Sequence, residues 1–257
     1  MLLDIQNLGI SFGGLKAVQN FSLRIPRGGL YGLIGPNGAG KTTVFNLLTG
    51  VYEPNGGTIK LDGTELVGME PCEIAAAGVS RTFQNIRLFP DLTVLDNVRV
   101  AMHLRGKHRL ATTLCRAKCH LTEESAQKEK ALGLLDVFNL RPRADEYARN
   151  LPYGDQRRLE IIRAMATCPK LILLDEPAAG MNPSEKIDLA RSIENIRTKF
   201  DLTVLLIEHD MTLVMDVCEM ITVLDYGQII AVGTPAEIQK NPKVIEAYLG
   251  EEVTDAA

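Results

Sequence analysis

Residues 35–42, which read Gly-Pro-Asn-Gly-Ala-Gly-Lys-Thr, constrain the fold of this chain more than any other stretch. They match the pattern G-x-x-x-x-G-K-[ST], whose glycines let backbone N–H groups converge on phosphate oxygens. An apolar run at residues 29–34 precedes the pattern, and a helix-like segment begins near Lys41. This order of strand, loop and helix predicts a phosphate-binding loop, in which Lys41 reaches the outer phosphates and the Thr42 hydroxyl ligates Mg²⁺. An ordinary glycine-rich turn would not require that context.

Length and composition set broad limits. The 257 residues suffice for one large domain or for a core with an inserted subdomain, and 46% hydrophobic with 23% charged residues is typical of a soluble globular protein. A net charge of −4 argues against wholesale binding of nucleic acid. No segment approaches the roughly 18 to 20 apolar residues of a membrane-spanning helix, and residues 1–4 lack the basic and apolar regions of a signal peptide, so we expect a cytoplasmic protein. Its five cysteines, an odd number, suit reduced thiols.

The N-terminal region has the pattern of antiparallel strands. Residues 3–8 and 18–25 alternate apolar with polar side chains on either side of a Gly-Gly turn, and residues 58–61 predict a further hairpin strand. Phe12 lies between the first two strands. It is either a core or edge aromatic or a stacking platform for an adenine ring, since every base offers a π-face.

From about residue 91 to residue 151 the pattern becomes helical, which predicts a helical insertion into an α/β core. The insertion contains a basic run at residues 103–120 that also holds histidines and cysteines. A solvated basic face is the simplest interpretation, because a zinc site would need a second, properly spaced ligand pair. Contact with an anionic membrane surface is a further alternative.

Residues 151–156, Leu-Pro-Tyr-Gly-Asp-Gln, lead into an amphipathic helix. Asp155 near its start complements the helix dipole. The N–H groups of Gly154 and Asp155 can receive an anion there.

Two acids end the apolar run at residues 171–174. Continuous hydrophobicity is typical of a strand buried on both faces of a parallel sheet, and such sheets bind ligands beyond the carboxyl ends of their strands. We therefore expect Asp175 and Glu176 at the same sheet edge as Lys41, with different roles because neighbours on an extended chain point to opposite sides. Asp175 suits Mg²⁺, directly or through water, and Glu176 suits activation of an attacking water as general base.

A second buried strand, residues 202–207, leads into Glu208 and His209. A single histidine is more often structural than catalytic. This one follows a core strand on the side where phosphate is expected, so we predict that it contacts the γ-phosphate. Gln84, at the end of a short strand expected at residues 79–84, carries little meaning by itself.

In this order the motifs resemble the ATP-binding subunit of ABC transporters over nearly the whole chain. The matching pieces are the phosphate loop, Gln84 at the Q-loop position, the signature-like residues 151–156, Asp175 and Glu176 after the Walker-B strand, the turn at residues 178–182, and His209 at the switch position. Within that family, residues 81–84, 153–161, 175–180 and 207–211 look like the subunits of branched-chain amino acid importers.

The resemblance implies an α/β P-loop NTPase core with a mostly parallel sheet, an N-terminal antiparallel β subdomain and an inserted helical subdomain. We delimit a single ABC ATPase domain over residues 1–257, in which residues 1–90 and 159–257 form the nucleotide-binding core with the β subdomain and residues 91–158 form the helical signature subdomain. The implied function is hydrolysis of ATP to power uptake of branched-chain amino acids.

The resemblance also implies partners. A second copy or a paralogous subunit completes a dimer, in which each nucleotide lies between one subunit's phosphate loop and the other's signature segment. Integral membrane permease subunits couple to the Gln84 region and the helical insertion, and a solute-binding protein acts indirectly. The chain is then peripheral, on the cytoplasmic face of the inner (plasma) membrane, with no nucleic acid as partner.

The resulting site residues fall into four groups. Glu176, His209 and Gln84 are assigned to catalysis. Nucleotide binding is assigned to Phe12, Gly35, Pro36, Asn37, Gly38, Ala39, Gly40, Lys41, Thr42 and Thr43. Gly154, Asp155 and Gln156 form the signature segment that acts on the partner's nucleotide, and Mg²⁺ is assigned to Thr42, Gln84 and Asp175.

The chain departs from the family pattern at three places. The signature usually reads Leu-Ser-Gly-Gly-Gln, whereas here Pro152 and Tyr153 replace Ser and the first Gly, and Asp155 replaces Gln. Proline has no hydroxyl, so the serine contact to the γ-phosphate is not expected. Asn182 replaces the usual Asp in the turn after Walker B.

Other functions within reach of the same motifs are transport of another solute or a lipid, a soluble ABC ATPase acting on ribosomes or nucleic acid, and a nucleotide sensor that no longer hydrolyses ATP. A single phosphate loop, a short insertion and intact Glu176 and His209 weigh against the last two. Nothing in the chain reads out the solute.

Overall fold

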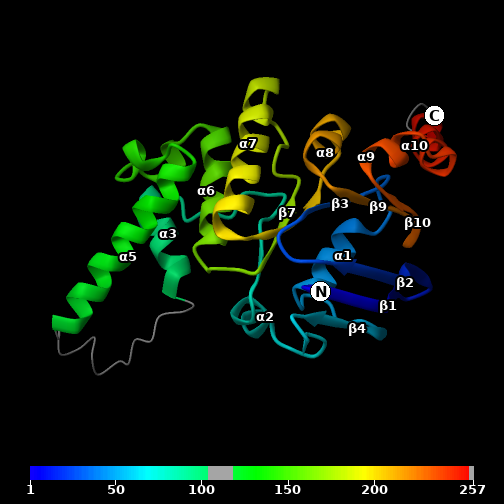
Figure 1. Cartoon of the computed structure of the whole chain (residues 1–257), viewed down its shortest axis with the longest axis horizontal. Helices are drawn as coiled ribbons and strands as arrows, with labels where there is room; N and C mark the ends of the chain where they lie inside the picture. The colour runs from blue at the N-terminus through cyan, green and yellow to red at the C-terminus, as the bar shows by residue number, and fades with distance from the viewer. Residues whose placement is uncertain (104–117, 255–257) are drawn as a thin grey trace.

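The structure, a computed structural model, describes residues 1–103 and 118–254. A six-stranded sheet has the order β10-β9-β3-β8-β7-β6, and a four-stranded sheet has the order β2-β1-β4-β5 (Figure 1). The larger sheet consists of β3 (Leu30–Ile34), β6 (Val79–Arg81), β7 (Leu171–Asp175), β8 (Thr203–Ile207), β9 (Met220–Asp225) and β10 (Gln228–Gly233). The smaller consists of β1 (Leu3–Phe12), β2 (Leu15–Ile25), β4 (Gly56–Leu61) and β5 (Thr64–Glu65).

Some helices pack on the sheets, and those at residues 94–102, 118–137 and 153–165 form a separate group at one end of the molecule (Figure 1). The helices are α1 (Lys41–Leu48), α2 (Pro71–Ala77), α3 (Val94–Met102), α5 (Lys118–Val137), α6 (Tyr153–Met165), α7 (Pro183–Phe200), α8 (Met211–Val217), α9 (Pro235–Gln239) and α10 (Pro242–Thr254), with the short 3₁₀ helices η2 (Arg141–Arg143) and η3 (Ala148–Asn150). No helix in residues 1–103 or 118–254 has the length and apolar character to cross a membrane.

The larger sheet is parallel except at its β10 edge, which confirms the predicted fold class. β3 lies between β8 and β9, and β7 pairs with β8 from Leu171 opposite Thr203 to Asp175 opposite Ile207. The carboxyl ends of these strands therefore meet at one edge. That edge is where the phosphate loop follows β3 and where the acids and His209 follow β7 and β8.

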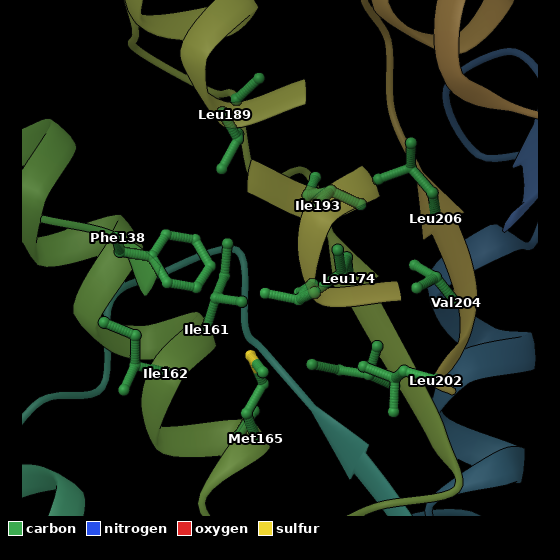
Figure 2. Packing of buried hydrophobic residues seen from close by; sticks show 14 of the residues in the cluster. Phe138, Ile161, Ile162, Met165, Leu174, Leu189, Ile193, Leu202, Val204 and Leu206 are labelled. Carbon is green, nitrogen blue, oxygen red and sulfur yellow. The ribbon is translucent and has the colours of Figure 1, made fainter. Parts of the chain in front are cut away.

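Alternate residues of the central strands enter two different cores. Leu174, Val204 and Leu206 pack toward α6 and α7, as Figure 2 shows. Their strand neighbours Leu173 and Leu205 pack instead with α1 and the antiparallel sheet. Burial on both faces explains why these strands read as uninterrupted apolar runs.

The antiparallel sheet and the helix after the phosphate loop share one core. Val44, Phe45 and Leu48 on α1 are buried against residues of β1, β3 and β4. The predicted antiparallel β subdomain is thus confirmed, and it covers the face of α1 that the large sheet leaves open.

The helical region begins with α3, whose N-cap Thr93 accepts a hydrogen bond from the Asp96 N–H. The expected boundary between residues 158 and 159 falls inside α6, a continuous helix that therefore belongs to both units as we delimited them. The basic run at residues 103–120 lies almost wholly outside the described residues, so its predicted role as a solvated face stays a prediction.

One predicted strand is shorter than expected. Residues 79–84 were expected to be extended, but β6 ends at Arg81. The carbonyls of Phe83 and Gln84 leave the sheet and accept hydrogen bonds from the Arg157 guanidinium. Beyond Thr82 the backbone thus bonds to a residue far along the chain, which the local pattern does not reveal.

Candidate active site

The phosphate loop requires glycine at two positions for measurable reasons. Gly35 and Gly40 have φ angles of 150° and 103°, which residues with a side chain rarely adopt. A Cβ atom would lie 1.9 Å from the Leu224 carbonyl oxygen at Gly35 and 2.6 Å from the Ala17 carbonyl oxygen at Gly40. The loop can therefore pass close to β9 and β2 only with glycine at these positions.

Lys41 is held against this loop. Its ammonium group donates to the carbonyls of Gly35 at 2.6 Å and Pro36 at 2.7 Å, and the residue is 6% exposed. Helix α1 starts at Lys41, so the N–H groups of its first turn and the lysine charge face the same end of the loop. Together they make a site suited to an anion.

A groove of about 700 Å³ brings most of the predicted residues together. It is lined by Phe12, by Asn37 through Thr43, and by Gln84, Glu176 and His209. Tyr226, which the sequence did not single out, also lines it and is 83% exposed. These residues come from six separate parts of the chain, so only the folded structure assembles the groove.

Phe12 is the last residue of β1 and is half-exposed at the groove. Its ring meets the Tyr52 ring edge-on with 5.1 Å between centroids. Of the two interpretations, an aromatic at the edge of the sheet describes its place, and its stacking on adenine stays a prediction.

Glu176 occupies the centre of the polar cluster. One carboxylate oxygen accepts from the Gln84 side-chain amide at 2.9 Å, and the other lies 2.9 Å from His209 Nε2. The backbone of Glu176 is left-handed, with φ of 47°, a conformation that costs a non-glycine residue on the order of 1–3 kcal/mol. This turn directs the side chain out of β7 and toward the groove.

Glu208 binds the backbone next to Glu176 and that of His209. Its buried carboxylate accepts from the Ala178 N–H at 2.7 Å and from the His209 N–H at 3.1 Å. Burial raises the pKa of Glu208, and the backbone donors oppose that rise. The two bonds tie the turn after Glu176 to the start of the segment that carries His209.

Asp175 points to the other side, as expected for adjacent residues, and it forms an ion pair with Arg81. Its carboxylate is 2.7 Å from the Arg81 guanidinium, and the two side chains are only 4% and 6% exposed. Arg81 also donates to the Asn46 side chain at 2.6 Å. The hydroxyl, amide and carboxylate oxygens of Thr42, Gln84 and Asp175 are of the kind that Mg²⁺ prefers, so the donor set suits the metal chemically, although Asp175 is engaged by Arg81.

In the described part of the chain, no group of three or more His, Cys, Asp or Glu residues is arranged to hold a metal ion.

The signature-like segment lies apart from this groove. Asp155 forms ion pairs with Arg158 at 3.3 Å and Arg143 at 3.5 Å, and the Gln156 amide donates to the Leu151 carbonyl at 2.9 Å. Within the described residues, neither these two nor Gly154 lines the groove of the phosphate loop. Their predicted contact with a partner's nucleotide therefore stays a prediction.

The fold and the groove define a P-loop nucleotide-binding protein whose second, antiparallel sheet packs on the helix after the loop. The chain belongs to the ABC transporter family, because the family model of that description matches residues 18–179. A second model, described as branched-chain amino acid ATP-binding cassette transporter, matches residues 228–254. The resemblance inferred from the motifs is thereby confirmed.

Similar proteins cover nearly the whole chain. It is 47% identical to the high-affinity branched-chain amino acid transport ATP-binding protein BraF of Pseudomonas aeruginosa, over 97% of this chain and 98% of that protein. It is 48% identical to LivG of Escherichia coli, which has the same description, over 97% and 98%. A crystal structure of the ADP conformation of MJ1267, an ATP-binding cassette of an ABC transporter, has a TM-score of 0.84 at 32% identity, covering 97% of this chain and 98% of that one.

Three charged residues near the site were missed from the sequence. Arg81, Arg157 and Glu160 have side chains no more than 6% exposed. The available signal was that Arg157 and Glu160 are spaced by three residues on α6, which places both on one face of the helix. Their partners lie more than 70 residues away and could not be identified from spacing.

Proposed function

We propose that this chain is the ATP-hydrolysing subunit of an ABC importer of branched-chain amino acids. The observation that carries the hydrolytic part is the Glu176 carboxylate, which lies between Gln84 and His209 at the edge of the phosphate-loop groove. The solute is inferred from the relatives' names.

In this proposal the phosphate loop and Lys41 bind the phosphates, and the Phe12 ring stacks on the base. Glu176 accepts the proton of the attacking water, an effect typically worth about 10²–10⁴-fold. His209 holds one oxygen of Glu176 and reaches the γ-phosphate. Thr42, Gln84 and Asp175 would hold Mg²⁺, which supplies charge neutralisation at the phosphate oxygens.

The proposed assembly contains a second copy or a paralogous subunit, integral membrane permeases and, indirectly, a solute-binding protein. The chain then works at the cytoplasmic face of the inner membrane, attached through the permease. The separation of Gly154 and Asp155 from the groove of their own chain supports a role toward a second copy.

Glu176→Gln tests the hydrolytic assignment. It keeps an oxygen toward its neighbours but cannot accept the proton, so we expect ATP binding within about twofold of wild type, turnover reduced at least about 100-fold, and a dimer that persists in ATP. Glu53→Gln, an exposed change away from the groove, should turn over ATP normally. Normal ATP turnover by Glu176→Gln would refute the assignment of Glu176 as the general base.

The solute needs the assembled transporter. The chain should be purified with its membrane partners, placed in vesicles, and assayed for ATP turnover with a binding protein loaded with leucine, with an unrelated amino acid or with nothing. Stimulation by the leucine-loaded form alone supports the proposal. The lipopolysaccharide export system ATP-binding protein LptB of Haemophilus influenzae is 34% identical over 98% of both chains, so stimulation by lipid instead would favour lipid transport.

A further inference from the structure

The guanidinium of Arg157 connects two segments that are far apart in sequence. It lies on the first turns of α6 and donates to the Phe83 carbonyl at 2.9 Å and to the Gln84 carbonyl. It also donates to the Tyr153 hydroxyl at 3.1 Å from Nε and 2.9 Å from Nη2. Its side chain is 4% exposed, so these acceptors replace water as its partners.

Glu160, one turn further along α6, binds the N–H side of the same segment. Its carboxylate accepts from the Phe83 N–H at 3.4 Å and the Arg87 N–H at 3.3 Å, and lies 3.5 Å from Arg157. The side chain is 3% exposed, and burial raises its pKa. Two opposite buried charges of one helix thus hold carbonyls and N–H groups of residues 83–87.

Tyr153 extends this arrangement to the turn after Glu176. It stands where the family signature has a glycine, and its ring centroid is 5.4 Å from the Arg157 guanidinium carbon. A Cβ atom at Gly180 would lie 3.0 Å from Tyr153 Cε1, so the tyrosine ring packs directly on that glycine. The tyrosine therefore contacts both Arg157 and the turn at residues 178–182.

We propose that Arg157, Glu160 and Tyr153 are positioning residues that make the signature-like segment and Gln84 move as one unit. This inference rests on the proposed function, in which the start of α6 faces a partner's nucleotide. A contact there displaces α6, and Arg157 and Glu160 carry residues 83–87 with it. Since the Gln84 amide is 2.9 Å from Glu176, the displacement reaches the catalytic carboxylate.

The physical reason for the coupling is the burial of the charges. If α6 moved while residues 83–87 stayed, a guanidinium and a carboxylate would each lose hydrogen bonds in a place that water does not reach. Moving both segments together retains the bonds. Tyr153 offers the arginine a third acceptor that the glycine of the usual signature cannot provide.

Arg157→Lys is the first test, because an ammonium keeps the charge but cannot reach three acceptors with a planar fork. We expect the ATP affinity to stay within about twofold, since none of the groove residues changes. The kcat of the single variant should fall at least about tenfold, and so should ATP-driven dimerisation when the change is combined with Glu176→Gln. Arg99→Lys, an arginine paired with Asp96 and Glu124 on the same side of the molecule, is the matched control and should change neither. Retention of kcat and dimerisation by Arg157→Lys overturns the proposal.

Hydrogen exchange separates this proposal from the proposed function and does not depend on turnover. In wild type, ATP should change the protection of residues 83–87 and of residues 153–157 together. In Arg157→Met/Glu160→Leu, which removes both charges so that neither is left unpaired, ATP should change residues 153–157 without the accompanying change in residues 83–87. Identical responses of wild type and double variant refute the coupling, whereas no response to ATP in any segment of wild type refutes the proposed function itself.

Discussion

Replacement of Arg81 by methionine should destabilise the protein far more than loss of an ordinary ion pair. The Arg81 guanidinium lies 2.7 Å from Asp175, and the two side chains are 6% and 4% exposed. It also bonds Asn46 and lies 5.5 and 5.2 Å from the ring centroids of Phe45 and Phe83. Methionine fills much of the same volume but leaves the Asp175 carboxylate buried without its counterion.

Breaking a buried pair from one side typically costs about 3–5 kcal/mol, because the remaining charge is uncompensated. One wild-type feature lowers this figure. Arg81 Nε is buried without a hydrogen-bond partner among the described residues, an arrangement that methionine removes. We therefore expect the free energy of unfolding to fall by about 3 kcal/mol, the lower end of that range.

The measurement is urea unfolding followed by far-UV circular dichroism, since the chain contains no tryptophan. The control is Arg24→Met, which breaks an exposed 3.3 Å pair with Asp4 and should cost less than about 1 kcal/mol. Arg81→Met/Asp175→Leu, with both charges removed, should recover most of the lost stability. A loss below about 1 kcal/mol for Arg81→Met, or a double variant as unstable as the single one, would refute the reasoning.

Three other predictions concern the groove and the core. Phe12→Ala should weaken ATP binding about 5- to 100-fold, the range for loss of one base–aromatic stack, in equilibrium titrations; an unchanged affinity would remove Phe12 from the site. Gly35→Ala should abolish ATP binding because its Cβ would lie 1.9 Å from a backbone oxygen, whereas Gly14→Ala, with open space around it, should bind normally. Burial raises the pKa of the Cys218 thiol to about 12, so the folded state keeps a proton that the unfolded chain loses above about pH 8.5. The free energy of unfolding should therefore fall as pH rises from about 8.5 toward 12. Urea unfolding at pH 8 and pH 10 should show a smaller fall for Cys218→Val than for wild type; an equal fall in the two proteins would contradict this assignment.

Local chemistry made much of the fold predictable. The phosphate loop, the helix starts at Pro71, Pro183 and Pro235, and the buried strands before Asp175 and His209 depend on residues within a few positions of one another. Glycine conformations, capping boxes and apolar periodicity act over that range, so they are legible in the sequence. The order of motifs then identified the family.

What the sequence could not supply was which charged groups face one another across the fold. The place of Asp175 after a strand predicts a Mg²⁺ ligand, which stays a prediction, but it gives no sign of the ion pair with Arg81, 94 positions away. Arg157 donates a hydrogen bond to the Gln84 carbonyl, 73 positions away in the sequence. No periodic pattern encodes such contacts, because they arise only when separate strands and helices are packed against each other.

The chain by itself thus determined a P-loop core, its two kinds of sheet and most of the residues that line the phosphate groove. Only the tertiary structure decided that Glu176 lies between Gln84 and His209, and that α6 carries two buried charges that bind residues 83–87. The first set follows from local backbone and burial preferences. The second follows from the need of every buried charge to find a partner, wherever in the sequence that partner stands.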